Sequence, residues 1–243
     1  ILDPERRGAL YPWLHRLRAL APVHPSEGLN VPGGFVLSRY EDIRAVLRHP
    51  GAFSDERNAD IFDVGEAGAV FTAMMRKQIL YLSPPDHDRI RALVARSFTP
   101  RAVERWRAAA EREVERLLDA AVERGKLDLV KDLAYPLPIA VICEMMGIPK
   151  RDVPLFFQWA HDFARRGDVA ALSPDVIRRG EEATTGFRDY FLELARERRK
   201  QPQDDLLTLI ALARDARGAL TDDELAATCV ILLQAGHETT ADL

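Results

Sequence analysis

Cysteine, excess positive charge and long apolar runs are all scarce in this chain of 243 residues. Its two cysteines, Cys143 and Cys229, lie in apolar stretches, so we expect buried free thiols and a reducing compartment rather than a disulfide framework. The formal charge of -4 gives no basic excess of the kind that binds nucleic acid. No signal peptide and no apolar run long enough to span a bilayer is recognisable, so we expect a cytoplasmic protein without a membrane partner.

What the chain does contain is an ordinary mixture for a globular protein, with 47% apolar and 30% charged residues. Its pattern predicts a mainly α fold with a small β-sheet region at about residues 20–40, and nearly continuous helix from about residue 84. We expect one domain over residues 1–243. Apolar periodicity and punctuating Gly and Pro residues predict helices over residues 10–20, 40–48, 67–77, 84–97, 100–124, 132–146, 152–166, 174–199, 204–213 and from 221 onward.

The last of these helices is the most informative. Thr221 and Glu224 form a capping box, in which each side chain binds the backbone N–H of the other residue. From Leu225 to Ala235 the helix is apolar on nearly every side, which indicates a position in the centre of the protein.

The stretch "LLQAGHETTADL" ends that helix with polar residues in an apolar setting. Gly236 costs about 1 kcal/mol relative to alanine inside a helix. Thr239 lies four residues after Ala235, so its hydroxyl can bond the Ala235 carbonyl and loosen the local hydrogen-bond ladder. A missing side chain beside a diverted carbonyl predicts a groove in the helix wall, with further donors and acceptors from His237, Glu238 and Thr240.

Two simpler interpretations compete with a groove. A lone glycine in a helix often serves close packing against a neighbour. The string "HETTA" also begins like the zinc motif His-Glu-x-x-His, but Ala241 stands where the second histidine ligand is needed.

The segment Ala235-Gly236-His237-Glu238-Thr239-Thr240 resembles the oxygen-binding part of the central helix in cytochrome P450 enzymes, the haem-thiolate monooxygenases. The resemblance implies that Ala235 and Gly236 leave room for dioxygen above the haem. It also implies that Glu238 and Thr239 relay protons there, and that Ala235 and Thr239 contact the cofactor.

A second, upstream string supports the resemblance: "SPPDHDRIRALVARSFTPRAVERW" is similar to the haem-facing helix of the soluble bacterial members. His87 and Arg91 are four residues apart and therefore share one helical face. Alone, this spacing is also typical of a solvated surface. Within the resemblance it implies that both residues bind the haem propionates, with Leu80 and Phe98 packing at the edge of the ring.

The resemblance covers essentially the whole chain and includes "FVLSRYEDIRAVLRHPGAFS" and "DLAYPLPIAVICEMMGIP". It implies substrate contacts from the loop at 60–80 with Phe71, from a lid at 156–175, and from Leu232 and Ala235. The family's cysteine ligand lies in a pattern Phe-x-x-Gly-x-x-x-Cys-x-Gly that surrounds neither cysteine of this chain. We therefore expect no iron ligand here, an axial cysteine beyond Leu243, and a P450-like fold that is incomplete on its C-terminal side.

The implied function is insertion of one atom of dioxygen into a small apolar organic substrate, by hydroxylation or epoxidation, at haem b (iron protoporphyrin IX). A ferredoxin and a ferredoxin reductase would supply the electrons. Residues 86–112 carry seven arginines against four acids, so we expect part of this basic excess to dock an acidic ferredoxin. The alternative is a haemless P450-like protein that serves as a binding module or scaffold.

Overall fold

The structure is a computed structural model that describes residues 10–26, 34–49, 58–169 and 171–241, with only the backbone described at 100–102 and 105. The chain divides into two compact units, Ile1–Ile61 and Phe62–Leu243. Each unit is described by itself, and the expectation of a single domain over residues 1–243 stays a prediction.

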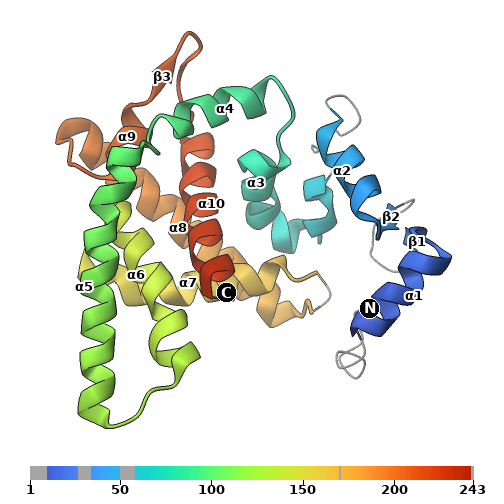
Figure 1. Cartoon of the computed structure of the whole chain (residues 1–243). Coiled ribbons are helices and arrows are strands. Elements are labelled where there is room, and N and C mark those ends of the chain that lie inside the picture. Colours follow the sequence, from blue (N-terminus) through green and yellow to red (C-terminus); the bar gives the residue numbers. More distant parts are fainter. Residues whose placement is uncertain (1–9, 27–33, 50–57, 170, 242–243) are drawn as a thin grey trace. The chain divides into compact units, whose positions relative to one another are not determined.

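The first unit contains the predicted β region. Strand β1 (Val23–Ser26) pairs antiparallel with β2 (Gly34–Leu37), with Val23 opposite Leu37 and Ser26 opposite Gly34. Helix α1 (Leu10–Leu20) precedes the hairpin and α2 (Tyr40–Arg48) follows it (Figure 1). The prediction of a small sheet at about residues 20–40 is confirmed.

The second unit is helical apart from one two-stranded hairpin, β3 (Arg214–Asp215) with β4 (Gly218–Ala219). Its α-helices, in chain order, are α3 (Ala69–Lys77), α4 (Asp86–Ala95), α5 (Pro100–Arg124), α6 (Pro136–Met145), α7 (Val153–Gly167), α8 (Pro174–Lys200), α9 (Leu206–Leu212) and α10 (Asp222–Ala241). The predicted mainly α class with a small β region is confirmed.

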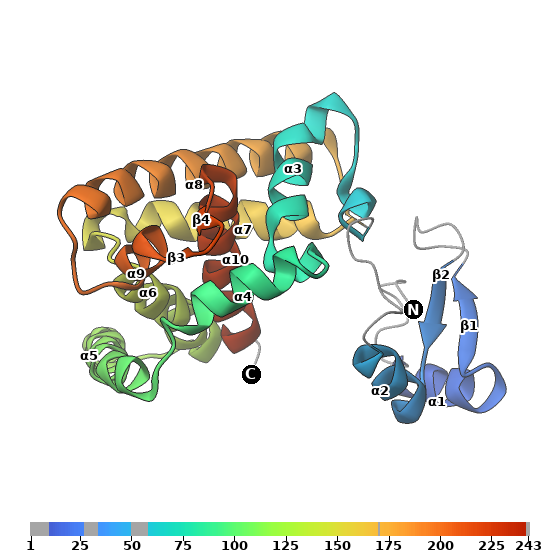
Figure 2. The same ribbon diagram turned by 90° about the horizontal axis from the view of Figure 1, so that it is seen from above.

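Helix α10 lies at the centre of this unit, as its all-round apolar sequence predicts. It contacts α3, α6, α7, α8 and α9, and Figures 1 and 2 show it enclosed between them. Its first three turns are fully buried at Leu225, Cys229 and Leu233. At its start, Oε2 of Glu224 accepts from Thr221 N at 2.8 Å and Glu224 N donates to Thr221 Oγ1 at 3.3 Å, which confirms the predicted capping box.

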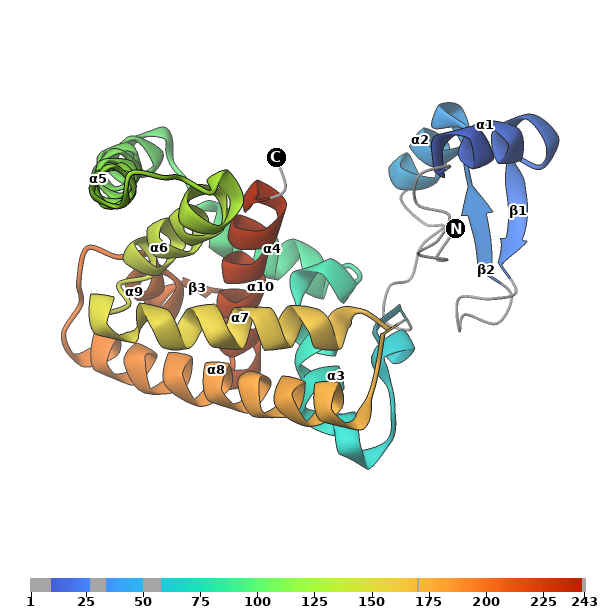
Figure 3. The same cartoon turned by 90° about the horizontal axis from the view of Figure 1, so that it is seen from below.

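Helices α7 and α8 lie side by side along one face of α10 (Figure 3). Aromatic rings fill the seam between them because large apolar side chains recur at helical spacing on both. The Phe187 ring on α8 lies 5.5 Å from Phe156 and 5.3 Å from Trp159 on α7, centroid to centroid. Such edge-to-face pairs add to the stabilisation from buried area.

Several predicted boundaries differ from the structure by two residues or more; α4, for example, is Asp86–Ala95 where 84–97 is expected. The helix expected over 132–146 is divided at Tyr135 into a π-helical segment, Leu129–Ala134, and α6, because Pro136 has no N–H to continue the ladder. The helix expected over 204–213 begins later, at Leu206, because Asp205 acts as its N-cap and accepts from Thr208 N at 2.7 Å.

Candidate functional site

The last turns of α10 differ from its buried beginning. The hydroxyl of Thr239 donates to the Ala235 carbonyl at 2.6 Å, the bond that the sequence predicts. Ala235 and Thr239 are exposed, and Leu232, one turn earlier, is half-buried. These three residues form an open stripe on the last turns of a helix that is buried from Leu225 to Val230. A hydroxyl with an adjacent small residue is thus accessible there to a ligand.

Gly236 and His237, within the same motif, face other parts of the protein. A Cβ at Gly236 would meet Cδ1 of Ile142 on α6 at 3.5 Å, an ordinary van der Waals distance. The bare side of Gly236 therefore faces α6. His237 is buried, with its ring 5.0 Å from Tyr135 and 6.2 Å from Phe157 between centroids. Glu238 is half-buried next to Thr239.

Helix α4 presents a cationic edge. His87 and Arg91 share a face, as their spacing predicts; the His87 side chain is 32% exposed and Arg91 is exposed. The Nδ1 atom of His87 lies 2.8 Å from Oδ1 of Asp88. Among the residues that the structure describes, no carboxylate pairs with Arg91. The pair can therefore receive the carboxylates of a ligand.

The predicted ring-edge residues are apolar and open. Leu80 is 63% exposed in a short 3-10 helix, Ile79–Tyr81, that contacts both α4 and α10. Phe98 lies between α4 and α5, is 39% exposed, and packs edge-on against Trp106 with the ring centroids 5.7 Å apart. An open apolar surface beside a cationic edge fits a flat apolar ligand that carries carboxylates.

Phe71 lies in a different environment from the one expected of a substrate contact. Its ring is fully buried, 4.6 Å from the Phe163 ring and 4.6 Å from the guanidinium carbon of Arg166. This burial gives Phe71 a packing role between α3 and α7 and leaves it no open surface. The burial has a physical reason: α3 turns this face toward α7 and α8, which sequence spacing alone does not reveal. A substrate contact at Phe71 stays a prediction.

Two long-range contacts hold α3 and the segment that precedes it against those helices. The Arg166 guanidinium donates to the Phe62 carbonyl at 2.7 Å, and the Glu181 carboxylate accepts from the backbone N–H groups of Val70 and Phe71 at 2.8 and 2.9 Å. A carboxylate at the first turn of a helix is favourable because the exposed N–H groups carry partial positive charge. Sequence reasoning missed both residues, since no local pattern marks them.

Neither cysteine suits a metal thiolate. Both are buried and free, which confirms that expectation. Burial raises the pKa of the Cys143 thiol to about 12 and also raises that of Cys229. Both thiols are therefore protonated at neutral pH in this environment, and among the described residues no group of three or more His, Cys, Asp or Glu side chains could hold a metal ion.

Comparison with known proteins agrees with this arrangement. The family model described as Cytochrome P450 matches residues 33–242. The chain is 36% identical over 239 residues to the cytochrome P450 monooxygenase PikC of Streptomyces venezuelae, and the match covers 96% of this chain and 54% of PikC. It is 35% identical over 233 residues to the cyclomarin C epoxidase CymV of Salinispora arenicola, covering 96% of this chain and 57% of CymV.

Solved structures show the same likeness. The crystal structure of P450BioI in complex with hexadec-9Z-enoic acid ligated acyl carrier protein superposes with a TM-score of 0.81 at 27% identity, covering 98% of this chain and 60% of that one. The chain belongs to the cytochrome P450 family. It spans about half the length of the curated relatives it matches. Among the described residues, no helix has the length and apolarity needed to cross a membrane.

Proposed function

We propose that this chain carries the oxygen-binding side of a haem-dependent monooxygenase that inserts one atom of dioxygen into an apolar organic substrate. The observation that carries the proposal is the Thr239 hydroxyl, bonded to the Ala235 carbonyl at 2.6 Å on the open stripe of α10. Family membership supports it, and so do two relatives whose names describe a monooxygenase and an epoxidase. Hydroxylation and epoxidation are the reactions expected.

Haem b would supply dioxygen activation when bound. The residues present fit it: His87 and Arg91 offer N–H donors to its propionates, while Leu80, Phe98 and Ala235 offer apolar contact. Neither cysteine is proposed as the thiolate ligand, since Cys143 and Cys229 lie outside the family's ligand pattern and are fully buried.

In this proposal the residues at the end of α10 handle protons and exclude water. The Thr239 hydroxyl could release the Ala235 carbonyl and donate its proton to oxygen that electrons from the redox partner have reduced, while the Glu238 carboxyl would return a proton to Oγ1 and regain one from solvent. Because the first turns of α10 are apolar, protons would be delivered only at its last turns, where the Thr239 hydroxyl and the Glu238 carboxyl lie. Leu232 and Ala235 are the proposed substrate contacts on this helix.

The test is an absorption spectrum of the purified protein, reduced and exposed to carbon monoxide. A strongly red-shifted Soret band is expected when the sample includes the segment with the axial cysteine, because a thiolate on the iron shifts that band. A sample that contains no haem would contradict the proposal and favour the haemless binding or scaffold protein. A haem spectrum without the red shift would contradict thiolate ligation.

The electron donor is proposed to be a ferredoxin, itself reduced by a ferredoxin reductase. The structure offsets part of the basic excess expected over 86–112, since Arg112 pairs at 2.6 Å with Glu144, which lies outside this range. The side chain of Arg105 lies outside the described set. Reversing the charges of Arg105 and Arg112 is expected to slow electron transfer several-fold at low ionic strength, because rim charges act on association. An unchanged rate at low salt would remove this surface from the proposal.

A further inference from the structure

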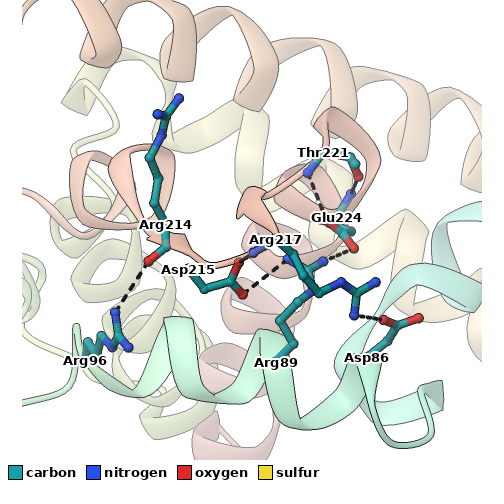
Figure 4. Close-up of polar contacts among 8 residues, drawn as sticks. All are labelled: Asp86, Arg89, Arg96, Arg214, Asp215, Arg217, Thr221 and Glu224. Atoms are coloured by element: carbon teal, nitrogen blue, oxygen red, sulfur yellow. Dashed lines mark hydrogen bonds and ion pairs between the residues drawn. The ribbon is translucent and has the colours of Figure 1, made fainter.

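The ion pair between Arg89 on α4 and Glu224 on α10 joins the two helices that carry the candidate site. The side chains are 10% and 15% exposed, and a guanidinium N–H of Arg89 donates to Oε1 of Glu224. A second guanidinium nitrogen lies 3.9 Å from Asp215 on the β3–β4 hairpin. Figure 4 shows Arg89 reaching from α4 between these two carboxylates. A guanidinium holds such partners in a fixed geometry because its donors are coplanar.

Glu224 is itself held in place. Its Oε2 atom accepts from Thr221 N at 2.8 Å in the capping box, while Oε1 accepts from Arg89. Burial acts to raise the pKa of Glu224, but the hydrogen bonds from Arg89 and Thr221 outweigh it and the pKa is lowered. Glu224 is therefore ionised at neutral pH, with both oxygens engaged. Arg89 is therefore bound to a fixed carboxylate at the start of α10, the helix whose last turns carry Ala235 and Thr239.

Helix geometry connects this anchor to the cationic edge of α4. Arg89 is two residues from both His87 and Arg91, so it points about 200° away from each around the helix axis. Ile90 and Leu93, both fully buried, form the stripe between them that rests on the core. Arg89 thus lies on one side of the buried stripe, and His87 and Arg91 lie on the other side. Any rotation of α4 that lifted the Arg89 side would move His87 and Arg91 inward.

We propose that Arg89 is a positioning residue whose bond to Glu224 fixes the rotation of α4 and so places His87 and Arg91 for the carboxylates of the cofactor. The inference rests on the proposed function, since those carboxylates are the haem propionates. It assigns to Arg89 no contact with haem or substrate.

The test compares haem dissociation from the holoprotein into an excess of an apo-acceptor protein for four forms: the unaltered protein, Arg89→Gln, Arg91→Gln and the double variant. Each single change is expected to speed dissociation on the order of tenfold, the usual effect of removing a group that orients a ligand. The double variant is expected to fall clearly short of the product of the two single effects, since with Arg91 removed only His87 is left for Arg89 to position. Effects that multiply instead would mean that Arg89 only stabilises the fold, and would overturn the inference.

Arg217→Gln is the matched control. It removes the ion pair between Arg217 and Asp86, whose charged atoms are 2.7 Å apart and whose side chains are about half exposed. This pair also joins the β3–β4 hairpin to α4. Haem dissociation should be unchanged in that variant, and acceleration equal to that of Arg89→Gln would overturn the inference. If Arg89→Gln does not fold, Glu224→Gln replaces it in the same four-way comparison. If Arg91→Gln alone leaves the rate of haem dissociation unchanged, Arg91 does not bind the propionates and that part of the proposed function fails. If the effects of Arg89→Gln and Arg91→Gln multiply, only the positioning role of Arg89 is refuted.

Discussion

Replacing Thr239 by alanine is expected to lower the product formed per electron consumed by about tenfold or more, which is within the range that positioned proton donors contribute. The variant loses the hydroxyl that reaches the open stripe of α10 and donates to the Ala235 carbonyl at 2.6 Å. Electrons would then leave as hydrogen peroxide instead of entering product. The fold should remain intact, because Thr239 is exposed and alanine favours a helix.

The measurement is the ratio of product to electrons supplied, together with the peroxide released, in the holoprotein with a ferredoxin and its reductase. Thr239→Ser keeps the hydroxyl and should keep most of the coupling. Thr240→Ala is the matched control, since it removes an exposed hydroxyl one position further around the helix. Coupling that survives Thr239→Ala, or falls equally in Thr240→Ala, would remove Thr239 from the proposed relay.

Gly180→Ala is expected to destabilise the protein by about 1–3 kcal/mol, the usual cost of overpacking a core. A Cβ at this position on α8 would lie 2.4 Å from Cβ and 2.5 Å from Cγ of Arg166 on α7. Those inner atoms move only with α7 itself, because the buried guanidinium is held at the Phe62 carbonyl and over the Phe71 ring. The methyl group should therefore force α7 and α8 apart, and this cost should exceed the gain of about 1 kcal/mol in helix propensity.

Gly236→Ala is the matched control, with the same change inside a helix and the opposite expected sign. Its new methyl group would meet Ile142 at 3.5 Å, an ordinary contact, so the free energy of unfolding should rise by up to about 1 kcal/mol. Urea unfolding monitored by circular dichroism measures both changes as shifts of the midpoint at constant slope. Equal midpoint shifts in the two variants would show that the close approach of Arg166 to Gly180 does not make an added methyl group destabilising.

Much of the site could be predicted from sequence because its signals are local. The capping box at Thr221 and Glu224, the buried beginning of α10 and the bond from Thr239 to Ala235 each depend on residues within a few positions of one another. The shared face of His87 and Arg91 follows from helical spacing in the same way. The roles of these residues toward haem and dioxygen stay predictions.

Other features could not be predicted, since they depend on which elements meet. Phe71 is expected at a substrate surface from its place in a loop, yet it is buried because α3 turns it toward Phe163 and Arg166. In the sequence, Arg89 is one more charged residue on an amphipathic helix, and no local pattern marks its partner. Its partner Glu224 lies 135 residues further along the chain.

The sequence by itself determined the helices, their caps and the family to which the chain belongs, because capping, glycine and proline placement and apolar periodicity act within one or two turns of backbone. Only the tertiary structure decided which side of each helix is enclosed, that the bare side of Gly236 faces Ile142, and that Arg89 joins α4 to α10. The physical reason is that burial and ion pairing depend on surfaces brought together by packing, and a linear pattern does not specify which surfaces those are.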